Sequence, residues 1–214
     1  MASVRPLVSC LTVTQAGRKD LLHAAVRQFE QQAYIPRELV IVTNAPQELP
    51  AFNNSAINVY PYPKGVQTLG DLRNLSVQRA QGALLAIWDD DDWRHPDYLA
   101  AQVACLGDWP LVMLQQIRLR CACGINVLSS QRAWECTMVV RQPVMIPYNS
   151  MDLREDTRLL RDLRVRGHIP GFNNQNNLYV KQFHNNNAWG AQHNARLFSL
   201  ADPPHSCRAL EAET

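Results

Sequence analysis

Short apolar runs alternate with amphipathic stretches through the first half of the chain, and this alternation restricts the possible fold more than any other feature. Four runs are predicted as buried strands, at residues 7–13, 39–42, 57–60 and 83–88. Three stretches with apolar side chains at helical spacing are predicted as helices, at 19–31, 69–81 and 97–106, with Gly82 as the C-terminal cap of the second. Such alternation is typical of an α/β domain with a mostly parallel central sheet flanked by helices.

The second half of the chain is less regular. Strands are predicted at 111–119, 136–140 and 178–183, and a helix at 153–166. We expect one domain over residues 1–214. Its halves are 1–106 and 107–202, and residues 203–214 form a tail.

Composition excludes several classes of protein. Apolar residues make up 46% of the 214 residues and support a sizeable core, while a net charge of +2 gives no electrostatic case for nucleic-acid binding. No apolar run reaches the roughly 18–20 residues of a membrane span, and the N-terminus does not resemble a signal peptide, so a cytoplasmic location is expected. Cys121, Cys123 and Cys136 lack the spacing of a zinc site, so reduced cysteines are expected instead.

Four consecutive aspartates, Asp89 to Asp92, directly follow the predicted strand 83–88. Like charges repel, so such a cluster needs either full solvation or a cation. A solvated loop that opens the next helix is one interpretation. The other is a cation site, because alternate side chains leaving a strand point to the same side and Asp89 and Asp91 could share Mg²⁺ or Mn²⁺. In open α/β sheets, ligands bind at this carboxyl end of the strands. The chain contains no glycine-rich phosphate loop, so a bound diphosphate would need such a metal.

The stretch TLGDLRNLSVQRAQGALLAIWDDDDWRHPDYL, residues 68–99, resembles the nucleotide-sugar-binding half of family 2 glycosyltransferases of the GT-A fold. The similarity covers residues 6–106 well and the rest more loosely. It implies a GT-A-like, Rossmann-related sandwich. It also implies that a D-x-D element on Asp89, Asp90 and Asp91 binds the metal and the donor, with Asp91 as the principal metal ligand. A donor contact of Arg73 is implied as well, beside the alternative of a surface arginine.

The stretch SMDLREDTRLLRDL, residues 150–163, carries a second acidic pair. The resemblance places the family's catalytic pair on Glu155 and Asp156, with Asp156 as the base and Glu155 in support. A helix-capping pattern of Asp152 with Glu155 is the alternative, although it leaves Asp156 without a role.

Further contacts follow from the same resemblance. His184, in LYVKQFHNNNAWG, is expected to complete the metal shell or to contact the diphosphate. Thr12 and Asn44 are expected to contact the donor, and Asn44 stands where the family often has an acidic residue. Trp134 and Trp189 are candidates for stacking on a sugar, and core packing is the alternative for each.

The implied function is transfer of a sugar, with inversion, from a nucleotide-diphosphate sugar to an acceptor hydroxyl, assisted by Mn²⁺ or Mg²⁺. A UDP-sugar is the expected donor; the acceptor is a glycan, a lipid-linked molecule or another hydroxyl compound. A non-catalytic nucleotide- or sugar-binding module is the alternative, followed by a nucleotidyltransferase. Arg154, Arg158 and Arg161 recur at helical spacing, which indicates a solvated helix face, or else contact with an anionic acceptor or a membrane surface.

Overall fold

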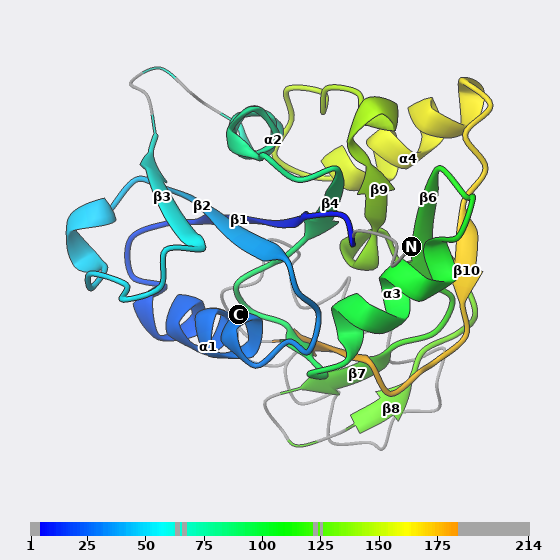
Figure 1. Ribbon diagram of the computed structural model, residues 1–214, viewed down its shortest axis with the longest axis horizontal. Helices are drawn as coiled ribbons and strands as arrows, with labels where there is room; N and C mark the ends of the chain where they lie inside the picture. The colour runs from blue at the N-terminus through cyan, green and yellow to red at the C-terminus, as the bar shows by residue number, and fades with distance from the viewer. Residues whose placement is uncertain (1–4, 63–64, 66–67, 122–123, 125, 184–214) are drawn as a thin grey trace, which may run out of the picture.

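A computed structural model describes residues 5–62, 65, 68–121, 124 and 126–183 (Figure 1). The helices are α1 (Lys19–Glu30), α2 (Leu69–Arg79), α3 (Tyr98–Leu106) and α4 (Glu155–Val165), with short 3-10 turns η1 (Pro46–Glu48), η2 (Glu135–Thr137) and η3 (Gln142–Val144). The strands are β1 (Val8–Thr14), β2 (Arg37–Thr43), β3 (Ile57–Pro61), β4 (Leu84–Ile87), β5 (Trp93–Arg94), β6 (Leu111–Leu114), β7 (Arg118–Cys121), β8 (Asn126–Leu128), β9 (Val139–Arg141), β10 (Gly171–Asn173) and β11 (Tyr179–Phe183).

The main sheet has seven strands in the order β10-β6-β9-β4-β1-β2-β3. Strands β3, β2, β1 and β4 are mutually parallel, β10 is parallel to β6, and β9 runs antiparallel between β4 and β6. A smaller sheet has the order β5-β11-β7-β8. The fold is therefore the predicted α/β sandwich with a mostly parallel central sheet, and both halves of the chain supply strands to it.

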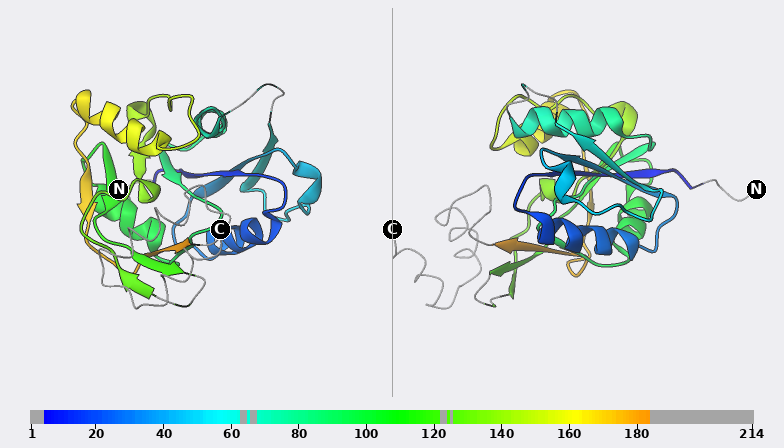
Figure 2. Two further views of the ribbon diagram at one scale, coloured as in Figure 1. Left: turned by 180° about the vertical axis from the view of Figure 1, so that it is seen from behind. Right: turned by 90° about the vertical axis from the view of Figure 1, so that its left-hand side faces the viewer.

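Helices cover both faces of the main sheet (Figures 1 and 2). Helices α1 and α3 lie on one face and α2 and α4 on the other. Alternation along β1 explains the two cores, because Cys10 packs on the α1 side and Leu11 on the α4 side. On the α4 side, Leu159, Leu160 and Leu163 recur at helical spacing and are all buried. None of the helices in the described part of the chain is long and apolar enough to cross a membrane.

The first-half elements lie close to their predicted bounds, but the structure corrects three details. The predicted strand 111–119 is two strands, β6 and β7, which belong to different sheets. The predicted strand 136–140 is divided between η2 and β9.

The third correction concerns Gly82, which does not cap α2. The helix ends at Arg79, and the capping residue Ala80 is extended. A Cβ atom on Gly82 would stand 2.6 Å from Ser9 Oγ and 2.7 Å from the Leu7 carbonyl oxygen. A glycine is needed here because the chain passes close to β1.

Candidate active site at the carboxyl edge of the sheet

The aspartate cluster lies beside the point where the strand order reverses. The chain moves from β1 outward to β2 and β3, then returns through α2 to place β4 on the other side of β1. The loops that follow β1 and β4 therefore meet at the carboxyl ends of two adjacent parallel strands. In open α/β sheets this crevice is where ligands bind.

Arg18, in the loop after β1, joins two of the four aspartates. Its Nε donates to Asp90 at 2.9 Å, and its Nη2 donates to Asp91 at 2.9 Å. Thr14 Oγ1 donates to the same Asp90 carboxylate at 2.6 Å. Asp90 is 4% exposed, so burial raises its pKa while the hydrogen bond from Arg18 opposes that shift. Asp90 thus fastens the two loops together.

The other two aspartates bind partners from other elements. Asp89 accepts from Arg73 Nη2 of α2 at 3.1 Å. Asp92 is buried and accepts hydrogen bonds from the Tyr179 hydroxyl, from Lys181 Nζ at 3.3 Å and from the Gln182 backbone N–H at 2.9 Å. Asp92 therefore attaches the turn to β11.

Arg94 is a buried arginine that the sequence did not indicate, and it supports the turn formed by the four aspartates. The Arg94 guanidinium lies 4.3 Å from the centre of the Trp88 ring and 5.0 Å from that of Tyr179. Its Nη1 donates to the backbone carbonyl of Asp89 at 3.0 Å. The positive charge stabilises the cluster above it and the carbonyl contact fixes the turn.

Arg73 also reaches the second acidic element. Its Nε donates to Glu155 Oε1 at 2.9 Å, while its Nη2 holds Asp89. One guanidinium group therefore connects the residue that follows β4 with the residue that opens α4. Burial raises the pKa of Glu155, and the charge of Arg73 opposes that rise.

The loop before α4 is fastened to α2 by side-chain and backbone bonds. Asn74 exchanges two hydrogen bonds with the backbone of Tyr148, at 3.0 and 2.7 Å. Ser150 donates to Asp71 at 2.6 Å. A Cβ on Gly70 would stand 2.0 Å from the Asn149 carbonyl oxygen, so the approach requires glycine. These contacts fix where Glu155 and Asp156 stand.

The capping alternative for Glu155 is wrong. Asp152 accepts instead from the Leu69 backbone N–H at 3.0 Å, and so serves the start of α2. The residue that caps α4 is Arg154, in the left-handed region at φ 66°, and no side chain caps that helix. Asp156 accepts from the N–H of Thr157 at 2.7 Å and keeps an intermediate exposure.

The remaining predicted residues have varied positions. Thr12 is fully buried and donates to the Trp88 carbonyl at 2.7 Å, so its side chain joins β1 to the residue that follows β4. Asn44 accepts from the Ala16 N–H at 2.8 Å and shapes the loop after β1. Trp134 is buried in the core with Arg132 over its ring, in agreement with the core alternative. His184 and Trp189 lie outside the described residues.

The described cysteines form no group that could hold a metal, and Cys123 lies outside the described residues. Cys136 is a free, buried thiol, whose pKa burial raises to about 12. Cys121 is disulfide-bonded, which corrects the expectation that all cysteines are reduced.

The donor chemistry of two aspartates fits a divalent cation. Asp89 and Asp91 alternate along the turn, and their side chains are 22% and 13% exposed, against 4% and 0% for Asp90 and Asp92. Carboxylate oxygens suit Mn²⁺ or Mg²⁺ when phosphate oxygens complete the shell. No group of three or more His, Cys, Asp or Glu side chains among the described residues is arranged to hold a metal by itself.

Comparison with solved structures decides the fold. The Staphylococcus aureus protein TarS, residues 1–349 in complex with UDP, superposes with a TM-score of 0.64 over 96% of this chain and 70% of its own, at 14% identity. The mannosyltransferase PcManGT from Pyrobaculum calidifontis, in complex with GDP-Man and Mn²⁺, superposes with a TM-score of 0.63. The match covers 99% of this chain and 70% of PcManGT, at 17% sequence identity. The chain has the GT-A glycosyltransferase fold. No protein-family model and no curated protein sequence matches it.

Arg18 is the main residue of the site that the sequence did not indicate. The stretch from Thr14 to Arg18 has no phosphate-loop pattern, and one arginine in a loop gives no local indication of a partner 72 residues away. Arg94 gave no signal either, because its contact with the Tyr179 ring comes from a distant strand and its bond to the nearby Asp89 carbonyl involves no side-chain pattern.

Proposed function

We propose that the chain is a glycosyltransferase that binds a nucleotide-diphosphate sugar at the carboxyl edge of β1 and β4. The observation that carries this proposal is the double contact of Arg73, which joins Asp89 of the aspartate turn to Glu155 of the second acidic pair. A module that only bound nucleotide would not need the second pair beside the first. The UDP complex of TarS and the GDP-Man and Mn²⁺ complex of PcManGT support the same donor class.

In the proposed reaction, the chain holds the donor and acceptor in line. Asp91 and Asp89 would hold the divalent cation, which when bound neutralises charge on the departing diphosphate. Asp156 accepts the proton of the acceptor hydroxyl while that oxygen bonds to the anomeric carbon, and the bond from this carbon to the diphosphate oxygen breaks. A single displacement of this kind inverts the anomeric configuration.

Glu155 and Arg73 act as positioning residues in this proposal. Glu155 is bonded to Arg73 and is buried, so it is held by the protein and is not available to the acceptor hydroxyl. Asp156 follows it on the first turn of α4 with an intermediate exposure, so its carboxylate is the accessible member of the pair. This division of roles matches a base that acts beside a fixed partner.

Calorimetric titration with UDP and with GDP, in Mn²⁺ and in chelator, tests the donor site. We expect binding of one nucleotide in Mn²⁺ and a large loss of affinity in chelator. Asp91→Asn removes an anionic ligand and should abolish the Mn²⁺ dependence, whereas the matched control Asp108→Asn, on an exposed residue, should not. Equal affinities with and without Mn²⁺, or an unaffected Asp91→Asn variant, would exclude the metal-assisted site.

A further inference from the structure

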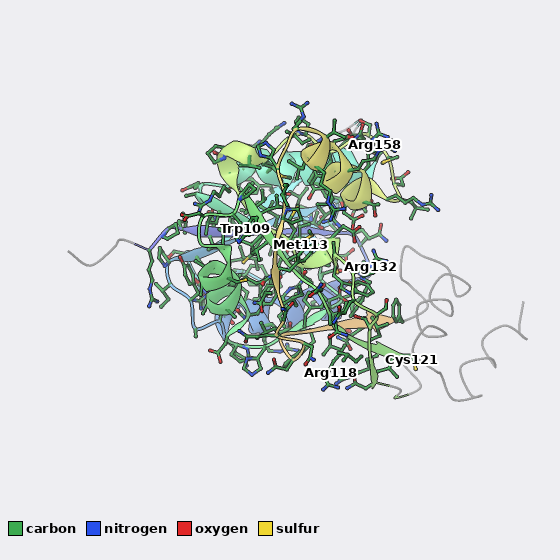
Figure 3. All side chains as sticks on the ribbon, turned by 90° about the vertical axis from the view of Figure 1, so that its right-hand side faces the viewer. Trp109, Met113, Arg118, Cys121, Arg132 and Arg158 are labelled. Atoms are coloured by element: carbon green, nitrogen blue, oxygen red, sulfur yellow. The ribbon has the colours of Figure 1, made fainter. Side chains whose placement is uncertain are left out.

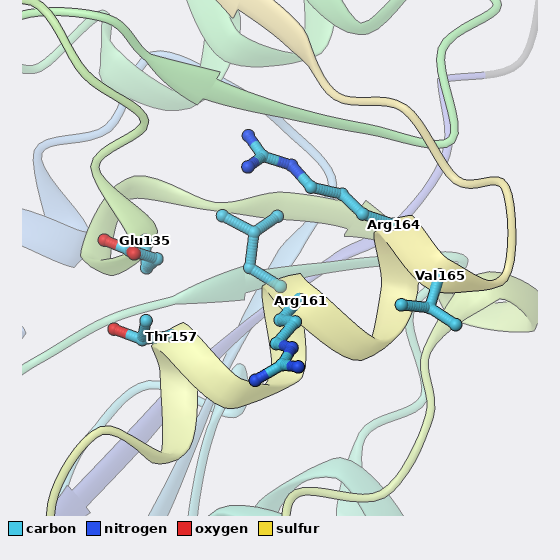
Figure 4. A pocket seen from close by; sticks show the side chains of 6 residues that line it. Glu135, Thr157, Arg161, Arg164 and Val165 are labelled. Carbon is cyan, nitrogen blue, oxygen red and sulfur yellow. The ribbon is translucent and has the colours of Figure 1, made fainter.

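A pocket of about 380 Å³ opens between η2 and α4, outside the aspartate cluster (Figure 4). It is lined by Glu135, Thr157, Leu160, Arg161, Arg164 and Val165. Figure 4 shows Glu135 and Thr157 at one end, with Arg161 and Arg164 further along the helix. The walls are therefore made by one exposed helix face and the turn that packs against it.

The pocket carries an excess of positive charge. Its one carboxylate, Glu135, is paired with Arg132 Nη2 at 2.9 Å, so a third guanidinium group stands beside the two that line the pocket. Arg161 and Arg164 form no ion pair with any described residue, unlike Arg158, which is paired with Asp162 at 3.2 Å. Three guanidinium groups against one carboxylate favour an anionic occupant.

The pocket begins beside the proposed base. Thr157 directly follows Asp156, and Thr157, Arg161 and Arg164 have the spacing of residues on one helix face. At about 1.5 Å of rise per residue, Arg164 lies roughly 10 Å along the axis from Thr157. Figure 3 shows Arg132, which precedes η2, below Arg158 of α4. Asp156 itself does not line the pocket, so an acceptor whose hydroxyl reached Asp156 would enter the pocket by running along α4.

We propose that the pocket binds a phosphate or phosphodiester group carried by the acceptor. The inference rests on the proposed glycosyl transfer, because it assigns the pocket to the second substrate. Figure 4 shows the guanidinium groups of Arg161 and Arg164 directed to different sides of the helix, so each offers its own contact along the pocket. Phosphate oxygens accept forked hydrogen bonds from such guanidinium groups. A lipid surface is the less favourable occupant, since a flat bilayer would not enter a pocket walled by η2 and would meet the Glu135 carboxylate there.

The test is titration of the full chain with glycerol 3-phosphate, followed by calorimetry or by NMR of the arginine side chains. The double variant Arg161→Gln/Arg164→Gln should bind at least roughly tenfold more weakly, since two charge-assisted contacts are lost. Arg166→Gln, at the end of the same helix and outside the pocket, makes a comparable charge change and should bind within about twofold of the unmodified chain. Glu135→Gln should bind more tightly, a gain that damage to the fold would not produce.

Four results would overturn the proposal. The double variant would bind glycerol 3-phosphate as well as the unmodified chain, or Arg166→Gln would weaken binding equally. Alternatively, the double variant would lose binding to vesicles of phosphatidylglycerol and phosphatidylcholine while keeping its affinity for glycerol 3-phosphate, which would assign the arginines to a membrane. UDP affinity, measured in Mn²⁺, should be unchanged in the double variant; a parallel loss would place the arginines in the donor site. Absence of UDP and GDP binding by the unmodified chain would instead count against the proposed function.

Discussion

Arg73 Nε lies 2.9 Å from Glu155 Oε1, so a side chain of α2 is bonded to the first residue of α4 across 82 positions of sequence. The same guanidinium holds Asp89 at 3.1 Å. Both carboxylates depend on one cation, which is itself 8% exposed as a residue. Removing Arg73 leaves both carboxylates without this partner, and the loss of a partner by a buried charge is costly.

Arg73→Met should destabilise the chain by about 3–5 kcal/mol, the usual cost of breaking a buried ion pair from one side. Restoring neutrality with Arg73→Met/Glu155→Met should recover part of this loss, because well-packed apolar residues can replace a buried pair. Urea unfolding measures both. Arg27→Met, on an exposed face of α1, is the matched control and should change stability by less than about 0.5 kcal/mol. An equal loss in the single and double variants would show that Arg73 contributes by packing alone.

Asp92→Asn should destabilise the chain by about 3 kcal/mol. Asp92 adjoins the proposed metal ligands, but its role is structural. The carboxylate holds Lys181, Tyr179 and the Gln182 backbone, so its loss detaches β11 from the turn. Asp91→Asn, one position earlier, should leave the free energy of unfolding nearly unchanged, since Arg18 keeps its bonds to Asp90. Urea unfolding of the two variants gives the comparison, and similar losses in both would contradict this division of roles.

Glu155→Gln should change how stability depends on pH. The pKa of Glu155 is raised above its ordinary value of 4.5 in the folded chain, so the folded state binds more protons than the unfolded state above that pH. The stability contributed by the protonated form is complete below 4.5 and is lost as pH rises through the folded pKa. The variant lacks this titration, so its free energy of unfolding should rise relative to that of the unmodified chain as the pH increases above 4.5. Glu30→Gln, on an exposed residue, should run parallel to the unmodified chain; a parallel Glu155→Gln curve would argue against the raised pKa.

Asp156→Asn should lower sugar transfer by roughly 10²–10⁴-fold, the usual contribution of a positioned general base, while UDP affinity in Mn²⁺ stays nearly constant. The measurement pairs calorimetry with transfer from a UDP-sugar to an acceptor found by screening phosphate-bearing alcohols. A purely structural Asp156 would give the opposite pattern: a loss of about 0.5–2 kcal/mol in stability with normal transfer. That outcome would remove Asp156 from the mechanism.

The sequence by itself determined the elements of the first half. Apolar runs such as 39–42 and the periodic residues of α1 are local signals, and a buried strand or an amphipathic helix follows from them wherever the chain packs. The same local logic placed the aspartates at the carboxyl end of β4, and with them the region of the candidate site.

The tertiary structure alone decided which partner each of the four aspartates binds. Asp89 to Asp92 are identical in sequence, and they differ because their partners come from α2, from the loop after β1 and from β11. The run 111–119 was divided for a similar reason, since β6 and β7 pair with strands of two different sheets. Partners that lie 70 to 90 residues away leave no trace in local spacing, so the pairing of Arg73 with Glu155 and of Asp92 with Lys181 exists only once the sheet has brought them together.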